Sequence, residues 1–149
     1  LSTDDNCFVR GTPVKPGHAI ERAGLTVTPM TVSHSVETLG YLVDDGKVAV
    51  AFPSDTGPTD SMWATLAAAP RLDAVFLEVS FPNELADLAA ITGHHYPVSF
   101  AAEIGKLARP VRWIVVHRKP RYADQIAAEL AALDLPNVEL VVPGQVYEF

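Results

Sequence analysis

Two nearly continuous apolar runs constrain the fold of this chain more than any other feature. Residues 73–79 read DAVFLEV and residues 112–116 read RWIVV, and each run has the length of a β-strand. A strand that is apolar along its whole length is covered on both faces, which is typical of the parallel strands of α/β proteins. The sequence therefore predicts two central strands within a layered fold.

The segments around these runs alternate between strand and helix patterns. Residues 25–32 alternate apolar and polar side chains, as in a half-buried strand. Asp45 and Gly46 form a hairpin-turn dipeptide between two short β runs. The remaining strands are predicted over residues 41–44, 47–52, 138–142 and 145–149, and the helices after Thr59 and over residues 83–91, 98–108 and 121–133. This order predicts a mixed α/β layer fold.

Composition excludes several classes of protein. The chain has 149 residues, of which 48% are hydrophobic, a share that is too high for disorder and sufficient for one core. No apolar run of about 18 residues lacks charge or proline, so no membrane-spanning helix is expected. Cys7 is the single cysteine, which excludes a disulfide framework and is compatible with the cytoplasmic location that we expect.

The charge of the chain bears on its partners. The formal net charge is −7, and the few basic clusters lie at residues 109–112 and 118–121. The electrostatic field of a negatively charged protein repels polyanions at long range. Nucleic-acid binders, in contrast, normally carry a clustered basic face. Long nucleic acid is therefore not expected as a substrate, whereas a small anion neutralised locally by metal ions is.

Three residues that can bind metals each follow the end of a predicted strand: His34, Asp55 and His117. Strand ends in α/β sheets open onto one edge, so residues far apart in sequence can converge there. Imidazole and carboxylate groups suit zinc, iron or manganese, and such a site activates water for attack on a phosphoryl or acyl centre. A structural alternative remains for each residue, namely a hydrogen-bonded histidine or an aspartate that stabilises its own turn.

Two further residues could take part in the chemistry. His94 lies in the loop GHHYP at residues 93–97, and it is predicted to act as a general acid or to contact a phosphate oxygen. The alternative for His94 is a position in a surface loop. Glu78 lies within an apolar run, where an unpaired carboxylate is unfavourable. Glu78 either supports the site by hydrogen bonding to its residues or occupies a strand edge beside a polar neighbour.

Read together, residues 25–144 resemble the C-terminal half of a metallo-β-lactamase-fold hydrolase. The segment VSHSVETLGY at residues 32–41 is similar to the family segment that carries a metal-binding histidine, here His34. Residues 54–56 (SDT) resemble the segment of the bridging aspartate, here Asp55, and His117 matches the last metal histidine. The resemblance implies the second half of an αβ/βα sandwich, a mixed sheet with helices on its outer face. It also implies two divalent metal ions, zinc first, with manganese or iron as alternatives.

Two branches of this superfamily share motifs with the chain. The run LEVSF at residues 77–81, then Gly93-His94 and later His117-Arg118-Lys119, resembles class II cyclic-nucleotide phosphodiesterases, although Val79 stands where that pattern has cysteine. The tRNase Z branch also has a Gly-His loop before an Ala-Ala-Glu-Ile helix, as at residues 101–104. The acidic charge and the absence of a basic arm favour the first branch, and hence a 3′,5′-cyclic nucleotide as substrate.

The main metal motif of the superfamily, His-x-His-x-Asp-His, occurs nowhere in the sequence. His34, Asp55 and His117 alone are too few ligands for a stable pair of metals. Because the chain also begins at Leu1, we expect residues 1–149 to form a single domain or half-domain whose N-terminal half is missing or lies on a separate chain. A sheet covered on one face only would expose an apolar surface, which that half or a second copy of the chain could cover.

These observations leave three functions open. The first is a metal-dependent hydrolase that cleaves a small phosphodiester, and the second is an RNA 3′-end-processing nuclease or another hydrolase of the superfamily. The third is a non-catalytic half that needs a partner chain. In all three cases we expect this chain by itself to be inactive.

Overall fold

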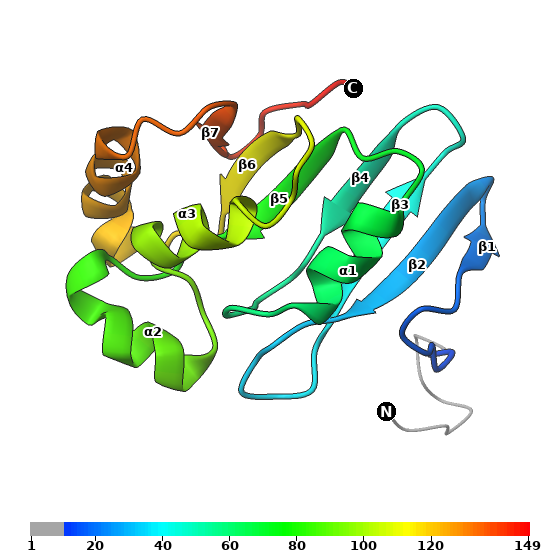
Figure 1. The fold of residues 1–149 in the computed structure, drawn as a ribbon, viewed down its shortest axis with the longest axis horizontal. Coiled ribbons are helices and arrows are strands. Elements are labelled where there is room, and N and C mark those ends of the chain that lie inside the picture. Colours follow the sequence, from blue (N-terminus) through cyan, green and yellow to red (C-terminus); the bar gives the residue numbers. More distant parts are fainter. Residues whose placement is uncertain (1–10) are drawn as a thin grey trace.

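The structure is a computed structural model that describes residues 11–149 of the chain. Its seven strands form one mixed sheet in which the spatial order follows the sequence order (Figure 1). The pairings are antiparallel from β1 to β4 and parallel from β4 to β7. The strands are β1 (Ile20–Arg22), β2 (Leu25–Thr31), β3 (Leu39–Asp44), β4 (Ala49–Phe52), β5 (Ala74–Glu78), β6 (Arg112–Val116) and β7 (Val138–Leu140). The predicted mixed α/β class is thus confirmed.

Four α-helices and two short 3₁₀ turns connect the strands. They are α1 (Ser61–Ala68), η1 (Asn83–Leu85), α2 (Ala86–Thr92), α3 (Pro97–Ile104), η2 (Pro120–Tyr122) and α4 (Ala123–Ala132). In the described part of the chain, none of these helices has the length and apolar character needed to cross a membrane.

The hairpin between β3 and β4 forms as the sequence predicts. The Asp45 carboxylate accepts hydrogen bonds from the backbone N–H groups of Lys47 (2.8 Å) and Val48 (2.7 Å), which lower the pKa of Asp45. Gly46 supplies the positive φ of 89° that the turn requires. The turn fixes the register of β3 against β4 and so determines where the loop after β4 begins.

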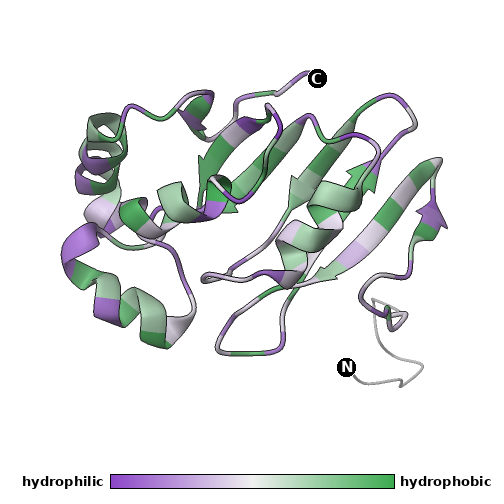
Figure 2. Cartoon of the chain, viewed as in Figure 1, coloured by the Kyte–Doolittle hydropathy of each residue, from purple (hydrophilic) through white to green (hydrophobic). Residues whose placement is uncertain are grey.

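The main core lies between the sheet and the helices on one of its faces (Figure 1). Val75 and Leu77 of β5 are fully buried in the same cluster as Leu66 of α1 and Phe100 of α3. Burying one such side chain contributes about 1.5–3 kcal/mol. Figure 2 shows that hydrophobic residues run along β5 and β6, whereas hydrophobic and polar residues alternate along β2, as the sequence patterns predict.

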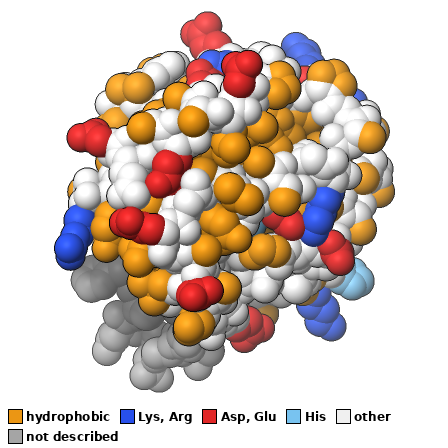
Figure 3. Space-filling view, turned by 60° about the vertical axis from the view of Figure 1, so that its left-hand side comes forward, with side chains coloured by type: hydrophobic (Ala, Val, Ile, Leu, Met, Phe, Trp, Pro, Cys, Tyr) orange, Lys and Arg blue, Asp and Glu red, His pale blue; other side chains and the backbone are white. Residues whose placement is uncertain are grey.

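The opposite face of the sheet carries a smaller aromatic group. Phe76 points away from the helices, because side chains alternate along β5, and it stacks on Phe52 with ring centroids 5.0 Å apart. Tyr147 and Phe149 of the C-terminal segment pack against Phe76 at 5.5 and 6.3 Å. Phe52 is nevertheless 42% exposed. On a different side of the molecule, the left-hand side of Figure 1 turned forward in Figure 3, apolar side chains also gather over the middle of the surface, with charged groups mostly around them.

Some element boundaries differ from the prediction. Residues 145–149 are not a strand, because they cross the aromatic group instead of pairing with a neighbouring strand. α3 ends at Ile104 rather than at residue 108, where tighter i→i+3 turns at Lys106 and Leu107 replace the α-helical pattern. The N-cap of α1 is Asp60 rather than Thr59, without a side-chain capping bond. β1 was not predicted, since its three residues are exposed and lack an apolar pattern.

Candidate metal centre

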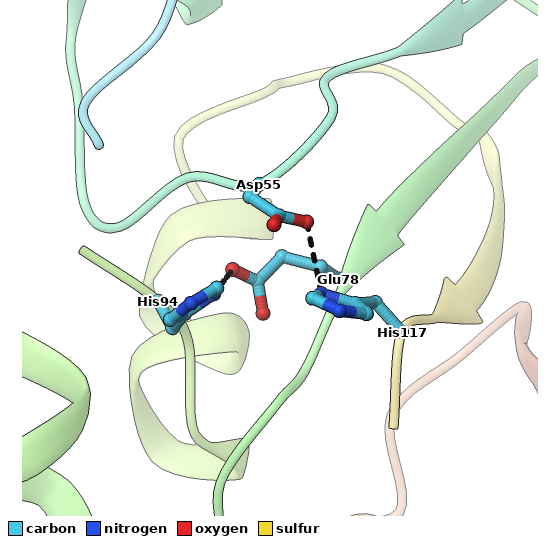
Figure 4. A group of neighbouring side chains, drawn as sticks. All are labelled: Asp55, Glu78, His94 and His117. Carbon is cyan, nitrogen blue, oxygen red and sulfur yellow. Dashed lines mark hydrogen bonds and ion pairs between the residues drawn. The ribbon is translucent and has the colours of Figure 1, made fainter. Parts of the chain in front are cut away.

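Four side chains with metal-binding atoms converge at the end of the sheet where the parallel strands finish (Figure 4). They are Asp55, Glu78, His94 and His117, and one ligand atom from each lies within 4.8 Å of the others. Glu78 ends β5, Asp55 and His117 follow β4 and β6, and His94 lies between α2 and α3. The convergence of strand ends that the sequence predicts therefore occurs.

Asp55 and His117 form one pair within this group. The His117 Nδ1 atom is 2.8 Å from Asp55 Oδ1 and 3.1 Å from the Ser80 hydroxyl. His117 has a positive φ of 55°, and so does Ser54, with 62°, directly before Asp55. Such backbone conformations are unfavourable for residues other than glycine and tend to cluster at functional sites. Here they turn both side chains toward one point as soon as each strand has ended.

Glu78 and His94 form the second pair. His94 Nδ1 lies 2.5 Å from Glu78 Oε1, which also accepts a hydrogen bond of 3.2 Å from the backbone N–H of Thr56. The other carboxylate oxygen, Glu78 Oε2, is buried and has no hydrogen-bond partner among the described residues. A buried oxygen without a partner is unfavourable unless a ligand or a water molecule satisfies it.

His34 lies beside the group of four rather than within it. Its ring meets the His94 ring edge-on, with centroids 4.9 Å apart, and its Nδ1 atom is 2.9 Å from the carbonyl oxygen of Gly93. A carbonyl can only accept, so Nδ1 donates and the lone pair of His34 is on Nε2. This arrangement is typical of histidines that bind metals. The structure therefore places all five residues singled out from the sequence in one region, and their individual roles stay predictions.

The loops that carry these residues touch through their backbones. Gly57 donates a hydrogen bond of 2.7 Å to the carbonyl of Ser33, which joins the loops after β2 and β4. Gly93 has a φ of +70°, and a Cβ atom added to it would lie 2.8 Å from the Cα of His34. Any larger residue at position 93 would push the His34 and His94 loops apart.

We therefore expect Gly93→Ala to destabilise the protein by about 2–5 kcal/mol, through the left-handed backbone conformation and the overlap with His34. Gly46→Ala is the matched control, because Gly46 also has a positive φ but a Cβ atom there would meet nothing within 4 Å. It should lose only about 1–2 kcal/mol. Chemical denaturation of the two variants measures the difference, and equal losses would show that the loops can separate at no cost.

The chemistry of the site suits a divalent metal. Imidazole nitrogens and carboxylate oxygens are the ligands that zinc, iron and manganese share, and both occur in the group of four. Glu78 Oε2 is in addition a buried acceptor that has no partner among the described residues. The residues present thus fit a metal, although they do not reach the ligand number of a complete pair of ions.

Comparison with known families decides the classification. Residues 1–118, well over half of the chain, match the family described as Beta-lactamase superfamily domain. The chain belongs to this superfamily. Its fold and its candidate metal centre are the features that the sequence motifs implied.

Individual members of the β-lactamase superfamily resemble the chain in sequence or fold. It is 29% identical over 130 residues to ribonuclease BN of Proteus mirabilis, a match that covers 86% of this chain and 41% of that protein. The metallo-β-lactamase-fold protein YhfI of Bacillus subtilis has a similar structure, with a TM-score of 0.71, 16% identity and coverage of 89% of this chain and 53% of YhfI. For the short form of human tRNase Z the TM-score is 0.61, with 16% identity and coverage of 82% and 42%. The chain therefore spans about half the length of these proteins or less.

Burial shifts the pKa values of both members of the Glu78–His94 pair. Desolvation raises the pKa of the Glu78 carboxyl to about 7. Desolvation also lowers the pKa of His94, and the positive charge of Lys119 adds to this effect. Both shifts favour the neutral forms, a protonated Glu78 and an uncharged His94.

His95, the neighbour of His94, is not one of the four grouped side chains. It is fully buried, with Nδ1 3.1 Å from the Ser99 hydroxyl and no described partner for Nε2. Burial lowers the pKa of His95 to about 4. Of the two adjacent histidines, only His94 thus belongs to the group of four.

His95 makes the stability of the fold sensitive to acid. The unfolded chain binds a proton at His95 below about pH 6.5, whereas the folded chain resists it down to about pH 4. The contribution of His95 to the free energy of unfolding is therefore present above about pH 6.5 and is lost as the pH falls toward 4. We expect His95→Asn to remove about 2 kcal/mol of the stability difference between about pH 7.5 and about pH 4.5. Denaturation curves at both pH values test this, with His18→Asn at an exposed site as the control that should change nothing.

One part of the site was not predicted from the sequence. Ser80, whose hydroxyl contacts His117, lies two residues after Glu78 at the end of an apolar run, and this position was its only signal. Glu78 was expected either to support the site by hydrogen bonding or to occupy a strand edge, and in the structure it bonds to His94 and is one of the four grouped side chains. Its burial, which the apolar run indicates, does not reveal which way the carboxylate points.

Proposed function

We propose that this chain contributes one part of the active site of a metal-dependent phosphodiesterase, with a small phosphodiester, first of all a 3′,5′-cyclic nucleotide, as its substrate. One observation carries the proposal: the Asp55–His117 pair, suited to metals, lies beside the Glu78–His94 pair, suited to proton transfer. Phosphodiester hydrolysis needs both functions, because water must be activated and the leaving oxygen must be protonated. The cytoplasm is the proposed location, in keeping with the single cysteine.

In this proposal His34, Asp55 and His117 bind two divalent ions, with Asp55 between them. Zinc is the first candidate, and manganese and iron share the same ligands. When bound, such ions activate water and stabilise charge on a phosphoryl group. The remaining ligands come from a second part of the fold that contains the His-x-His-x-Asp-His motif. We call this chain together with that part the assembled protein.

His94 and Glu78 handle the proton. Glu78 Oε1 lies 2.5 Å from His94 Nδ1, so it fixes the orientation of the ring and leaves Nε2 for the substrate. The buried position of Glu78 keeps the proton in the pair near neutral pH. When Glu78 Oε1–H donates to Nδ1, the neutral His94 ring carries its own proton on Nε2. That Nε2–H is therefore placed to protonate the leaving oxygen while Nδ1 takes the proton of Glu78.

A panel of substrates tests the proposal on the assembled, metal-loaded protein. Cyclic nucleotides, bis(p-nitrophenyl) phosphate, a thioester and a lactone differ in the bond that is cleaved but use the same metal ligands. The proposal predicts turnover of the phosphodiesters and none of the thioester or lactone. Turnover of the thioester or lactone alone would contradict it.

RNA 3′-end processing is the second candidate. It is favoured by the 29% identity to a ribonuclease BN. The net charge of −7 argues against it, because binding of a long polyanion relies on many basic contacts. An RNA with a 3′ extension, added to the same panel, distinguishes the two, since a nuclease would shorten it in preference to cyclic nucleotides.

The aromatic face of the sheet suggests how the assembled protein forms. Phe52 and Phe76 lie on the face opposite the helices, and Phe52 is partly exposed. We propose that the second part of the fold covers this face, with a homodimer of the chain as the alternative. Native mass spectrometry of the chain alone and of the assembled protein tests this proposal. A metal-free, monodisperse 149-residue monomer that stays soluble would argue against it.

A further inference from the structure

Three cationic side chains follow His117 closely, and each has a different partner. The Arg118 guanidinium donates a hydrogen bond of 3.2 Å to the backbone carbonyl of Val141. The Arg121 guanidinium lies 5.5 Å from the centre of the Tyr122 ring. The Lys119 ammonium lies 4.7 Å from the centre of the Phe81 ring and makes no ion pair or hydrogen bond to any described residue. Lys119 is therefore a cation whose three N–H donors have no acceptor within the described part of the chain.

The Phe81 ring connects Lys119 to the site. Phe81 is only 6% exposed, and its ring centroid is 5.7 Å from that of His94. Its backbone N–H donates to the carbonyl of His95 at 3.2 Å, which fixes the segment after β5 against the His94 loop. The ring thus has His94 and Lys119 as neighbours. Lys119 is therefore linked to the group of four in two ways. Its ammonium group lies over the Phe81 ring, which neighbours His94, and its backbone lies two residues after His117.

We propose that Lys119 is an anion-binding residue of this site, whose ammonium group binds a non-bridging oxygen of the substrate phosphate. The inference rests on the proposed function for the class of substrate. The site itself is rich in carboxylates, since Asp55 and Glu78 both belong to it. A chain with a net charge of −7 attracts no phosphate at long range, so a local cation is needed at the point of binding.

Phe81 holds the lysine in place without neutralising it. A cation above an aromatic face gains about 0.5–1 kcal/mol at a partly exposed site. A carboxylate partner would instead satisfy the ammonium and compete with the phosphate. A lysine side chain that is already restrained loses less conformational freedom when it binds a ligand. We therefore expect Phe81 to strengthen phosphate binding only through Lys119.

The test measures inorganic phosphate on the assembled, metal-loaded protein, by calorimetry and by competitive inhibition of bis(p-nitrophenyl) phosphate hydrolysis. Lys119→Gln should weaken phosphate binding about tenfold, the effect of losing one charged hydrogen bond, and should raise KM more than it lowers kcat. Lys119→Arg should restore part of the affinity. Phe81→Leu should weaken binding about threefold in the wild-type background and not at all in the Lys119→Gln background. Lys47→Gln, on the exposed β3–β4 turn, is the control and should bind phosphate as the wild type does.

Each outcome decides the inference. Unchanged phosphate affinity in Lys119→Gln with full metal content would overturn it, and so would an equal loss in Lys119→Gln and Lys47→Gln. A wild-type protein that contains metal but binds no phosphate would overturn it as well. Lys119-dependent phosphate binding without any phosphodiester turnover would support the anion site and contradict the proposed function. Phosphodiester turnover with unchanged KM in Lys119→Gln would support the proposed function and contradict the anion site.

Discussion

Replacing His94 by alanine should lower the kcat of the assembled protein by a factor of about 10²–10⁴ while its metal content stays unchanged. The imidazole is held by Glu78 at 2.5 Å and is placed to protonate the leaving oxygen. Its loss removes a proton donor but none of the three proposed metal ligands. Steady-state kinetics with a phosphodiester, together with metal analysis of the same samples, gives both quantities.

The leaving group provides a sharper readout of the same variant. A good leaving group such as p-nitrophenolate needs little protonation, so the loss caused by His94→Ala should be smaller for it than for an alkoxide leaving group. Glu78→Gln keeps the shape of the side chain and should reduce kcat in the same direction, since it removes the carboxylate that orients His94. Normal turnover by His94→Ala would show that the assigned role is wrong. Loss of metal in His94→Ala would instead make His94 a ligand.

Replacing Asp55 by asparagine should reduce metal affinity by more than about 100-fold and abolish turnover. That figure is the upper range for residues that only orient a ligand, and Asp55 is proposed to bind both ions directly. In the structure its carboxylate is 2.8 Å from His117 Nδ1, so the same substitution also leaves His117 without its anionic partner.

Asp87→Asn is the control for this substitution. Asp87 is an exposed carboxylate in the first turn of α2, and the same loss of one negative charge there should leave the metal content unchanged. Metal titration of both variants by calorimetry makes the comparison. If Asp55→Asn bound metal as tightly as Asp87→Asn, Asp55 would not be a ligand.

Much of the fold could be predicted because its central strands are apolar on both faces. The runs at residues 73–79 and 112–116 became β5 and β6, and β6 has the predicted bounds. The sequence did not reveal β1, whose residues have no pattern, or the path of residues 145–149. That path depends on the contacts of Tyr147 and Phe149 with Phe76, which are long-range.

The sequence was sufficient to predict which residues form the candidate site, but not which of their side chains bond to each other. The rule that strand ends converge placed Asp55 and His117 correctly near each other. It could not show that Glu78 bonds to His94, because both the direction of a buried carboxylate and the rotation of an imidazole depend on packing. Nor could it show the backbone contact between Gly93 and His34, which only a positive φ at residue 93 permits. Lys119 was part of the His117-Arg118-Lys119 motif, but its contact with Phe81 could not be predicted, because Phe81 lies 38 residues earlier in the chain.

We propose above all that residues of this chain hold catalytic metal in the assembled protein. A native mass spectrum of that protein, loaded with zinc, is the decisive experiment because it reports chains and metals in one measurement. We expect about two bound ions in the wild type and fewer in Asp55→Asn, with the chains unchanged. A folded, fully assembled wild-type protein that carries no divalent metal at saturating zinc would show that these residues are not metal ligands.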